Sequence, residues 1–372
     1  MKQKTDFHIN SPESKNRNYS LEKYFTDEIF GFHKSLPGYA ATPLIDLNLD
    51  ILANRNKRNI LLKDESQRFS MGAFKSLGAS WAIANHLKQK KGDFIFCSAT
   101  DGNHGRAVAW SARIFGHKAE IYMPSSTVNS RIKSIEEEGA RVIIVDGDYD
   151  EAVNLARKAA RQKNYVLIQD TSWEGYDHYP NLISAGYSTI IKEIEQQLNK
   201  SENFPEIVIL QSGVGSWAAA TMLYISRFTG FKRPGFIIVE PFESDCLLES
   251  AKNDKISTTR KSQNTIMAGL NCGTPSLSAW EIIRDYTDIF ISIDDSFIKT
   301  ALKELHMAGI QSCESGAAGI GGLLALLNNE GLVAGCEGDV PAAFSMFLAH
   351  QLTGQMSFMA NPAAIDKKND EI

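Results

Sequence analysis

Lys75 is a residue whose type and setting could support chemistry. It lies in the segment "RFSMGAFKSLGAS" (68–80), among small and apolar residues, where an apolar-periodic helical run begins. The helix dipole disfavours a lysine in the first turn, and both this effect and burial lower the pKa of its amine. Such a lysine can serve as a general base or attack a carbonyl carbon. The alternative is a surface lysine, which is what most lysines are.

A glycine-rich segment, "QSGVGSWAAA", lies between an apolar run and a helical pattern. Gly213, Gly215 and Ala218 match the spacing G-x-G-x-x-A, and Glu240 ends the next strand, where a ribose-binding acid belongs in a dinucleotide site. The same turn suits a lone phosphate, because backbone N–H groups and a helix N-terminus attract an anion. A close turn without a ligand is the third interpretation. Dinucleotide fingerprints usually open their domain, whereas several strands precede this one.

A second strand-to-helix segment is "SATDGNHGRAVAW", in which Gly102 and Gly105 flank Asn103 and His104. A polar loop at a helix N-terminus forms an anion nest that fits a carboxylate. Asp101 would repel an anion there unless it faces a cationic part of the same ligand. The alternative is that Asp101 or Asn103 only caps the helix.

Asp170 follows a third apolar run, "YVLIQD", and precedes Trp173 and Tyr176. If the strands before Asp101 and Asp170 are neighbours in a sheet, the two carboxylates line one cleft. Together they could bind an ammonium group or move protons. Two unrelated loop acids are the alternative.

The elements that must position these residues alternate from residue 59 onward. The alternation predicts βαβ units and parallel sheets, in which ligands bind beyond the carboxyl ends of the strands. The polar connection 249–276 is expected at the edge of that cleft. The expected strands are 59–63, 93–99, 119–124, 141–146, 165–170, 206–211, 235–240 and 288–293, and the expected helices are 74–90, 104–115, 128–138, 149–163, 181–199 and 216–228.

Composition limits the class of protein. The chain has 372 residues, 43% hydrophobic and 22% charged, which predicts a globular protein, most simply of two domains. A net charge of -5 argues against nucleic-acid binding, and no apolar run is long enough to span a membrane. Residues 1–18 are expected to form a mobile polar tail. Five cysteines without a C-x-x-C spacing indicate a reduced, cytoplasmic protein, and whether Cys246 and Cys272 pair stays open. The histidine spacing gives a metal site no support.

Four segments in one order resemble the diaminopropionate ammonia-lyase family: "KDESQRFSMGAFKSLGA", "TDGNHGRAVAW", "QDTSWEGY" and "QSGVGS". This family belongs to the fold-type-II pyridoxal-phosphate (PLP) enzymes, with the threonine and serine dehydratases. The resemblance runs from residue 37 to about residue 339. The segment 340–372 does not match the family pattern, and no longer insertion follows the helix 74–90.

The resemblance assigns a role to each motif. Lys75 would bind PLP covalently, Phe74 would pack near it, and Asn103 would hydrogen-bond its 3-hydroxyl. Cys336 would face the ring nitrogen of PLP. This is a departure from the Ser-Thr pair that we associate with the ammonia-lyase at this position. The phosphate would lie in a cradle formed by Gly213, Val214, Gly215 and Ser216. The substrate would be held by Ser98, Thr100, Asp101, Gly102, His104 and Asp170, of which Asp101 and Asp170 would face the diamine and act with Lys75 in catalysis.

The resemblance also implies a fold and a reaction. The fold is α/β and similar to tryptophan synthase β, with two open, mostly parallel sheets in two domains and helices on both faces. The large domain would be 1–77 plus 189–372, and the small domain 78–188. The reaction would be α,β-elimination of D- and/or L-2,3-diaminopropionate to pyruvate and ammonia. Lys75 would be the base for one enantiomer and Asp101 for the other. A serine/threonine dehydratase-like enzyme, a biosynthetic PLP lyase and a non-catalytic paralogue are the alternatives, and a homodimer is the family expectation.

Overall fold

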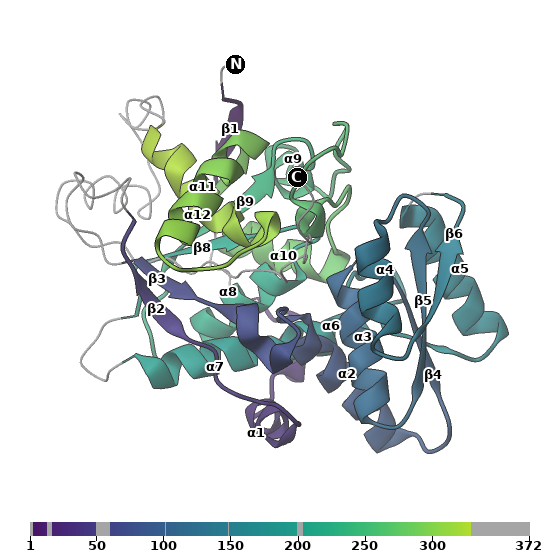
Figure 1. Cartoon of the computed structure of the whole chain (residues 1–372). Helices are drawn as coiled ribbons and strands as arrows, with labels where there is room; N and C mark the ends of the chain where they lie inside the picture. The colour runs from purple at the N-terminus through teal and green to yellow at the C-terminus, as the bar shows by residue number, and fades with distance from the viewer. Residues whose placement is uncertain are drawn as a thin grey trace.

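The computed structural model describes residues 3–12, 17–49, 60–100, 102–147, 149–198 and 204–328. These residues form two four-stranded sheets with helices around them, and one two-stranded sheet (Figure 1). Within these ranges, no helix combines the length and the apolar character needed to cross a membrane.

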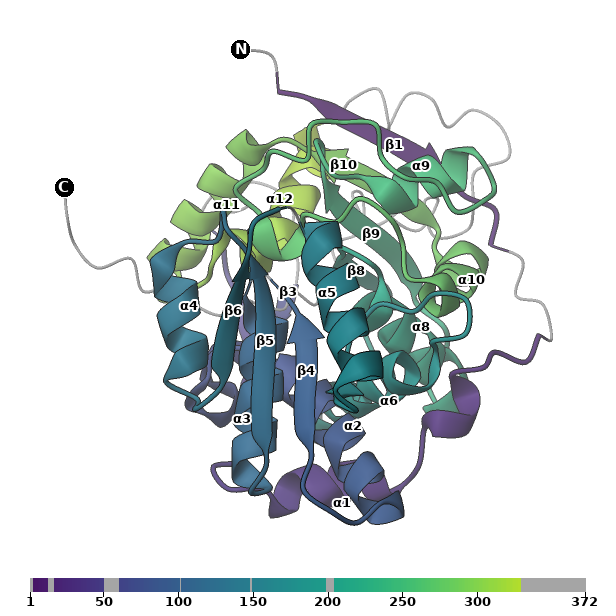
Figure 2. The same ribbon diagram turned by 90° about the vertical axis from the view of Figure 1, so that its right-hand side faces the viewer.

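The first sheet contains β4, β5, β6 and β7, is parallel throughout, and has the order β6-β5-β4-β7. Figure 2 shows it between α5 on one side and α3 and α4 on the other. Alternate strand residues face opposite sides, so Phe96 and Ile121 pack in the core that includes α3, while Cys97 and Tyr122 pack against α5. The bounds are β4 Ile95–Ala99, α3 Asn103–Ile114, β5 Lys118–Pro124, α4 Asn129–Glu136, β6 Arg141–Val145, α5 Tyr149–Gln162 and β7 Val166–Leu167.

The second sheet has the order β1-β10-β9-β8, and its strands β8, β9 and β10 are parallel. Val208 and Phe236 belong to the core that contains α8 and α10, whereas Ile209 and Ile237 face α12. Burial on both faces explains why these strands read as continuous apolar runs in the sequence. The bounds are β8 Ile207–Gln211, α8 Ser216–Phe228, β9 Gly235–Pro241, α9 Cys246–Lys252, α10 Leu277–Tyr286, β10 Ile289–Ile293, α11 Asp295–Met307 and α12 Glu314–Asn328.

The N-terminal residues correct one expectation. Thr5–Ile9 forms β1, which pairs antiparallel with β10 at the edge of the second sheet, with Thr5 opposite Ile293. A mobile tail over 1–18 is therefore wrong for these residues. The strand is short and partly exposed, so its own sequence carries little strand signal, and its pairing with β10 defines it.

Most of the remaining elements lie between strands of the two sheets in the sequence, and β2 and β3 form the two-stranded sheet. The single helix expected over 181–199 is two helices that are separated at Tyr187. There the N–H donates to the carbonyl of Ser184, three residues earlier, which is a 3₁₀-type bond rather than an α-helical one. The predicted boundaries 78–188 enclose the first sheet, and the boundaries themselves stay a prediction. The bounds are η1 Glu22–Tyr24, α1 Glu28–Ser35, β2 Leu44–Leu47, β3 Ile60–Lys63, η3 Glu65–Ser70, α2 Lys75–Gln89, α6 His178–Gly186, α7 Ser188–Gln197 and η4 Ala268–Leu270.

Candidate active site

Lys75 is the first residue of α2, and its amine is paired. Its Nζ donates a hydrogen bond to Asp170 Oδ2 at 2.8 Å, so the structure joins two segments that are 95 residues apart. Burial alone would lower the pKa of Lys75, but the Asp170 carboxylate raises that pKa above its ordinary value. The expectation of a lowered pKa is therefore wrong for this structure, because it considered burial and the helix dipole without this carboxylate.

Asp170 lies between Lys75 and His104. Although burial favours the neutral acid, the neighbouring His104 and Lys75 lower the pKa of Asp170 below its ordinary value. Burial lowers the pKa of His104 itself, and its Nε2 donates to the carbonyl of Ile168 at 2.8 Å. Its Nδ1 then faces Asp170 Oδ2 at 3.7 Å. An imidazole and an ionised carboxylate thus lie together beside the lysine amine.

The glycine-rich loop leads from β8 into the N-terminus of α8. The first N–H groups of a helix have no partner within it, and no side chain caps α8. Gly215 has φ +97°, and a Cβ there would lie 2.5 Å from Ile283 Cδ1, so a larger residue would be strained. Ser216 Oγ donates to the carbonyl of Asp170 at 2.6 Å. The turn therefore offers backbone N–H groups to an anion and also holds the Asp170 backbone.

The residues around Lys75 fit PLP. The phosphate cradle and the lysine amine are both linked to Asp170. Phe74 packs against Tyr187 and Trp217, with ring centroids 4.9 and 5.3 Å away, and so provides an aromatic wall. Among the described residues, the buried hydroxyls of Tyr187 and Ser212 find no hydrogen-bond partner. Buried hydroxyls usually have one, so these two atoms are available to a polar ligand.

The predicted carboxylate nest begins at the end of β4. Thr100 Oγ1 accepts the N–H of Gly102 at 2.9 Å, and α3 starts at Asn103 without a side-chain cap. The alternative role of Asn103 as a capping residue is therefore wrong. Ser98 Oγ donates to Gln169 Oε1 at 2.9 Å, so this hydroxyl holds the side chain of Gln169 against the end of β4. Direct substrate contacts by these residues stay a prediction.

Gln169 is a site residue that sequence reasoning missed. Its side-chain amide bonds to both the N–H and the carbonyl of Ala99, at 3.0 Å each, and to the hydroxyl of Tyr149 at 2.8 Å. It thereby continues the pairing between β4 and β7 by one side chain and ties Asp170 to the nest. Gln169 directly precedes Asp170 in the sequence, but neither its residue type nor its spacing predicts its contact with Ala99.

Four buried charged residues, three upstream of Lys75 and one on α7, anchor the chain that leads to Lys75. We call Lys63, Glu65, Arg68 and Glu193 the charge network. Arg68 donates to Glu65 at 2.7 Å and to Glu193 at 2.7 Å, and Lys63 pairs with Glu193 at 2.8 Å. Directly after Arg68, Phe69 and Ser70 have positive φ angles of 50° and 58°, which are uncommon for residues other than glycine. The network thus fixes the start of a strained turn that leads to Lys75.

Two predicted site residues, Asp101 and Cys336, lie outside the described residues, as does the segment 340–372. Their assigned roles stay predictions.

Glu240 removes the dinucleotide alternative. Its fully buried carboxylate accepts the N–H groups of Leu247 and Leu248 at 2.8 Å each, at the start of α9. Burial raises the pKa of Glu240 well above its ordinary value. This side chain therefore caps a helix and cannot reach a ribose.

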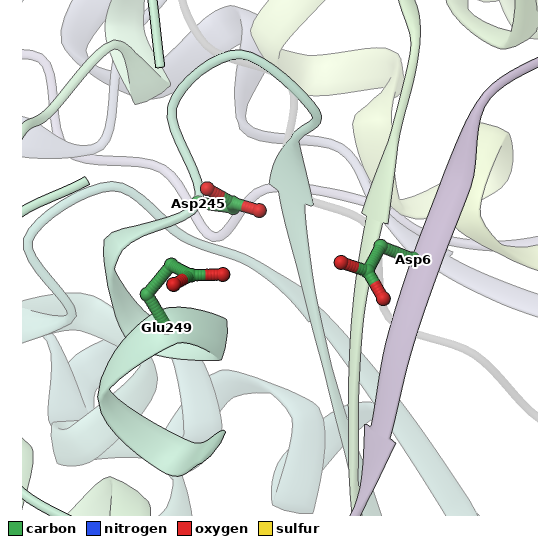
Figure 3. A group of neighbouring side chains, drawn as sticks. All are labelled: Asp6, Asp245 and Glu249. Carbon is green, nitrogen blue, oxygen red and sulfur yellow. The ribbon is translucent and has the colours of Figure 1, made fainter. Parts of the chain in front are cut away.

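A cysteine pair and an acidic cluster are two further candidate features of the described residues. Cys246 and Cys272, whose pairing the sequence left open, do not form a disulfide with each other. Asp6, Asp245 and Glu249 come close enough together to bind a cation (Figure 3). Lys252 and Lys261 already pair with these acids, so ion pairs explain the cluster without a metal.

Comparisons with known proteins agree with this geometry. A family model described as pyridoxal-phosphate dependent enzyme matches residues 36–335. The diaminopropionate ammonia-lyase of Salmonella typhimurium is 41% identical over 333 residues, which are 81% of this chain and 82% of that protein. The corresponding protein of Escherichia coli is 39% identical over 318 residues, 79% of each chain.

Solved structures give the same result. The crystal structure of diaminopropionate ammonia lyase from Escherichia coli, in complex with an aminoacrylate-PLP azomethine reaction intermediate, has a TM-score of 0.80 and 33% identity to this chain. The match covers 97% of this chain and 94% of that one. The chain therefore belongs to the pyridoxal-phosphate-dependent enzymes of fold type II, in the diaminopropionate ammonia-lyase family.

Proposed function

We propose that the protein catalyses the PLP-dependent α,β-elimination of 2,3-diaminopropionate to pyruvate and ammonia. The contact between Asp170 and the Lys75 amine at 2.8 Å, beside the glycine cradle, is the observation that carries this proposal. A buried carboxylate beside the reactive amine is a ready partner for the second ammonium group of a diamino acid. The names of the relatives add independent support.

Each residue then has a task. The N–H groups at the start of α8 would hold the phosphate of PLP, and Phe74, which packs against Trp217, would lie near the cofactor ring. When bound, PLP supplies an electron sink for the charge that develops as the substrate loses its Cα proton. Lys75 Nζ moves that proton for one enantiomer. Asp170 Oδ2 orients the β-ammonium group until it leaves as ammonia, and water then converts the released aminoacrylate to pyruvate and a second ammonia.

The charge on Asp170 gives the selectivity for a diamine over serine. A hydrogen bond to a charged group contributes about 1.5–3 kcal/mol. A neutral β-hydroxyl forgoes most of this stabilisation. The expected preference in kcat/KM for diaminopropionate is therefore about 10–150-fold, since each 1.4 kcal/mol is a factor of ten.

A pyruvate-release assay on the PLP-loaded enzyme tests the proposal. The substrates are D- and L-diaminopropionate, serine and threonine, the last two covering the dehydratase alternative. Asp170→Asn should remove the preference for the diamine, and Asp177→Asn, a change in an exposed acid of the same loop, is the matched control. Equal turnover of serine and diaminopropionate by the wild type would contradict the role of Asp170.

Asp101 is proposed as the base for the other enantiomer, following the family resemblance. Asp101→Asn should then impair one enantiomer at least tenfold more than the other, consistent with the loss of a general base. Comparable losses for both enantiomers would remove this assignment.

We also propose that the enzyme is a cytoplasmic homodimer. The four cysteines of the described residues form no disulfide, which supports a reducing compartment, while the dimer follows from the family resemblance alone. Light scattering on the purified protein measures the assembly directly.

A further inference from the structure

The loop that carries Asp170 is fastened to the glycine cradle by a group of buried serines. Ser276 Oγ accepts the N–H of Ser172 at 2.9 Å and lies 2.8 Å from its Oγ. The N–H of Ser276 in turn donates to the carbonyl of Val214, inside the cradle, at 2.8 Å. A continuous hydrogen-bonded path therefore runs from the phosphate cradle to the residue two positions after Asp170.

The same contacts complete the N-terminus of α10. Ser276 precedes this helix but makes no side-chain cap bond to it. Ser172 supplies the cap instead, because its Oγ accepts the N–H of Ser278 at 2.8 Å and its carbonyl accepts the N–H of Leu277 at 3.1 Å. The helix end and the loop thus satisfy each other's polar groups, and neither can move without exposing the other's.

Asp170 is held from its other side as well, through the bond from Ser216 Oγ to its carbonyl. Its backbone therefore lies between two contacts that both lead back to the cradle turn, one through Ser216 and one through Ser276. Its carboxylate must remain within hydrogen-bond distance of Lys75, and productive site geometry tolerates displacements of only about 0.5 Å.

We propose that Ser172 and Ser276 are positioning residues that couple occupation of the phosphate cradle to the placement of the Asp170 carboxylate. An anion bound at Gly213–Ser216 fixes the cradle, and the two serines transmit that order to the loop of Asp170. The proposal deepens the proposed function, on which it rests for the part that Asp170 plays in turnover.

Hydrogen exchange on the full chain freed of PLP tests the coupling without any substrate. Inorganic phosphate is the first probe and PLP the second. In the wild type, phosphate should slow exchange both in 212–218 and in 168–176. In Ser276→Ala, phosphate should still slow exchange in 212–218, but its effect on 168–176 should fall at least threefold. Equal protection of 168–176 in both proteins, or none in the wild type, would overturn the proposal.

Two controls separate positioning from a general loss of packing. Ser250→Ala removes a buried hydroxyl of α9 that bonds to the carbonyl of Cys246 and to neither Ser172 nor Ser276, and should leave the phosphate response unchanged. A response lost in Ser250→Ala as well would count against the proposal. Ser276→Thr keeps the hydroxyl and should restore the response. If Ser276→Ala does not fold, Ser172→Ala removes the Oγ–Oγ contact and the bond from the Ser278 N–H, while its own N–H keeps Ser276 Oγ as acceptor, and the same outcomes decide.

Kinetics of the PLP-loaded variants give a second readout. Ser276→Ala should lower kcat about tenfold with a smaller change in KM. The acidic side of its pH–kcat profile should also move to higher pH, because the pKa of Asp170 rises when its carboxylate loses its fixed contact with Lys75. An unchanged kcat and an unchanged pH profile would refute the positioning role. A wild type that exchanges as expected but does not use diaminopropionate would refute the proposed substrate and leave the coupling intact.

Discussion

Replacing Glu193 by glutamine should destabilise the protein strongly, because it unbalances the charge network. The Glu193 carboxylate, which is fully buried, accepts from Arg68 at 2.7 and 2.8 Å, from Lys63 at 2.8 Å and from the Tyr39 hydroxyl at 2.8 Å. Although burial works against ionisation, Arg68 and Lys63 hold the pKa of Glu193 at about 2, so the residue is charged at neutral pH.

The network is neutral as it stands, with two carboxylates and two cations. Glutamine leaves one uncompensated positive charge at a site where Arg68 and Lys63 have almost no solvent exposure. Breaking a buried pair in this way costs about 3–5 kcal/mol of unfolding free energy. The matched control is Glu195→Gln, two residues along α7, where a partly exposed pair with Lys192 contributes about 0.2–1 kcal/mol.

The pH dependence identifies the charge that causes the loss. Burial already lowers the pKa of Lys63, and loss of the Glu193 carboxylate lowers it further. The folded variant then binds fewer protons than the unfolded chain, whose lysines titrate near pH 10.4, so stability rises with pH. The loss of unfolding free energy caused by Glu193→Gln should therefore be greatest near neutral pH, and it should become smaller as the pH approaches 10.

Urea unfolding followed by tryptophan fluorescence measures these differences. The double variant Glu193→Gln/Lys63→Met restores neutrality and should recover part of the stability lost in the single variant. The reasoning is refuted if Glu193→Gln costs no more than Glu195→Gln, or if its cost does not change between pH 7 and pH 10.

Three further changes test other parts of the site. Asp170→Asn should reduce kcat/KM for diaminopropionate by about 10–150-fold, as expected for the loss of a charge-assisted hydrogen bond of about 1.5–3 kcal/mol to the β-ammonium group, and an unchanged kcat/KM in steady-state assays would contradict its role. Gly215→Ala should cost about 1–3 kcal/mol through its positive φ and the clash with Ile283, seen as weaker PLP binding in an absorbance titration or a lower urea midpoint. Burial lowers the pKa of His33 to about 3, so the wild type should lose stability as the pH falls below 6.5, by up to about 1.4 kcal/mol per pH unit. His33→Gln should flatten that slope in urea midpoints measured between pH 7 and pH 4.

The parallel strands could be predicted from the sequence because burial on both faces leaves an uninterrupted apolar run, as in β8 and β9. Strand β1 could not be predicted this way, since polar and apolar residues mix in Thr5–Ile9 and its partner lies far along the chain. The strand predicted over 165–170 is too long for a related reason. Only Val166–Leu167 pairs as a strand, and the side chain of Gln169 takes over from the backbone.

The site also contains residues that the sequence predicts and contacts that it does not predict. Lys75, Asp170 and the glycine turn stand at strand or helix ends, where local pattern marks them. The raised pKa of Lys75 could not be foreseen, because it depends on a carboxylate brought near by the fold. Ser172 and Ser276 look like ordinary loop serines, and their contact joins positions 104 residues apart.

During synthesis, β1, which lies at the edge of the second sheet, leaves the ribosome long before β10, the strand with which it pairs. Thr5 pairs with Ile293, and at about 5–20 residues per second the partner strand emerges roughly 15–60 s later. The first sheet is built from one uninterrupted stretch of chain, Ile95 to Leu167, and can form in the meantime because its contacts are closer in sequence. We therefore expect the nascent chain to hold a folded first sheet while β1 still lacks its neighbour, and β1 to pair at the edge of the second sheet only after Ile293 has been made.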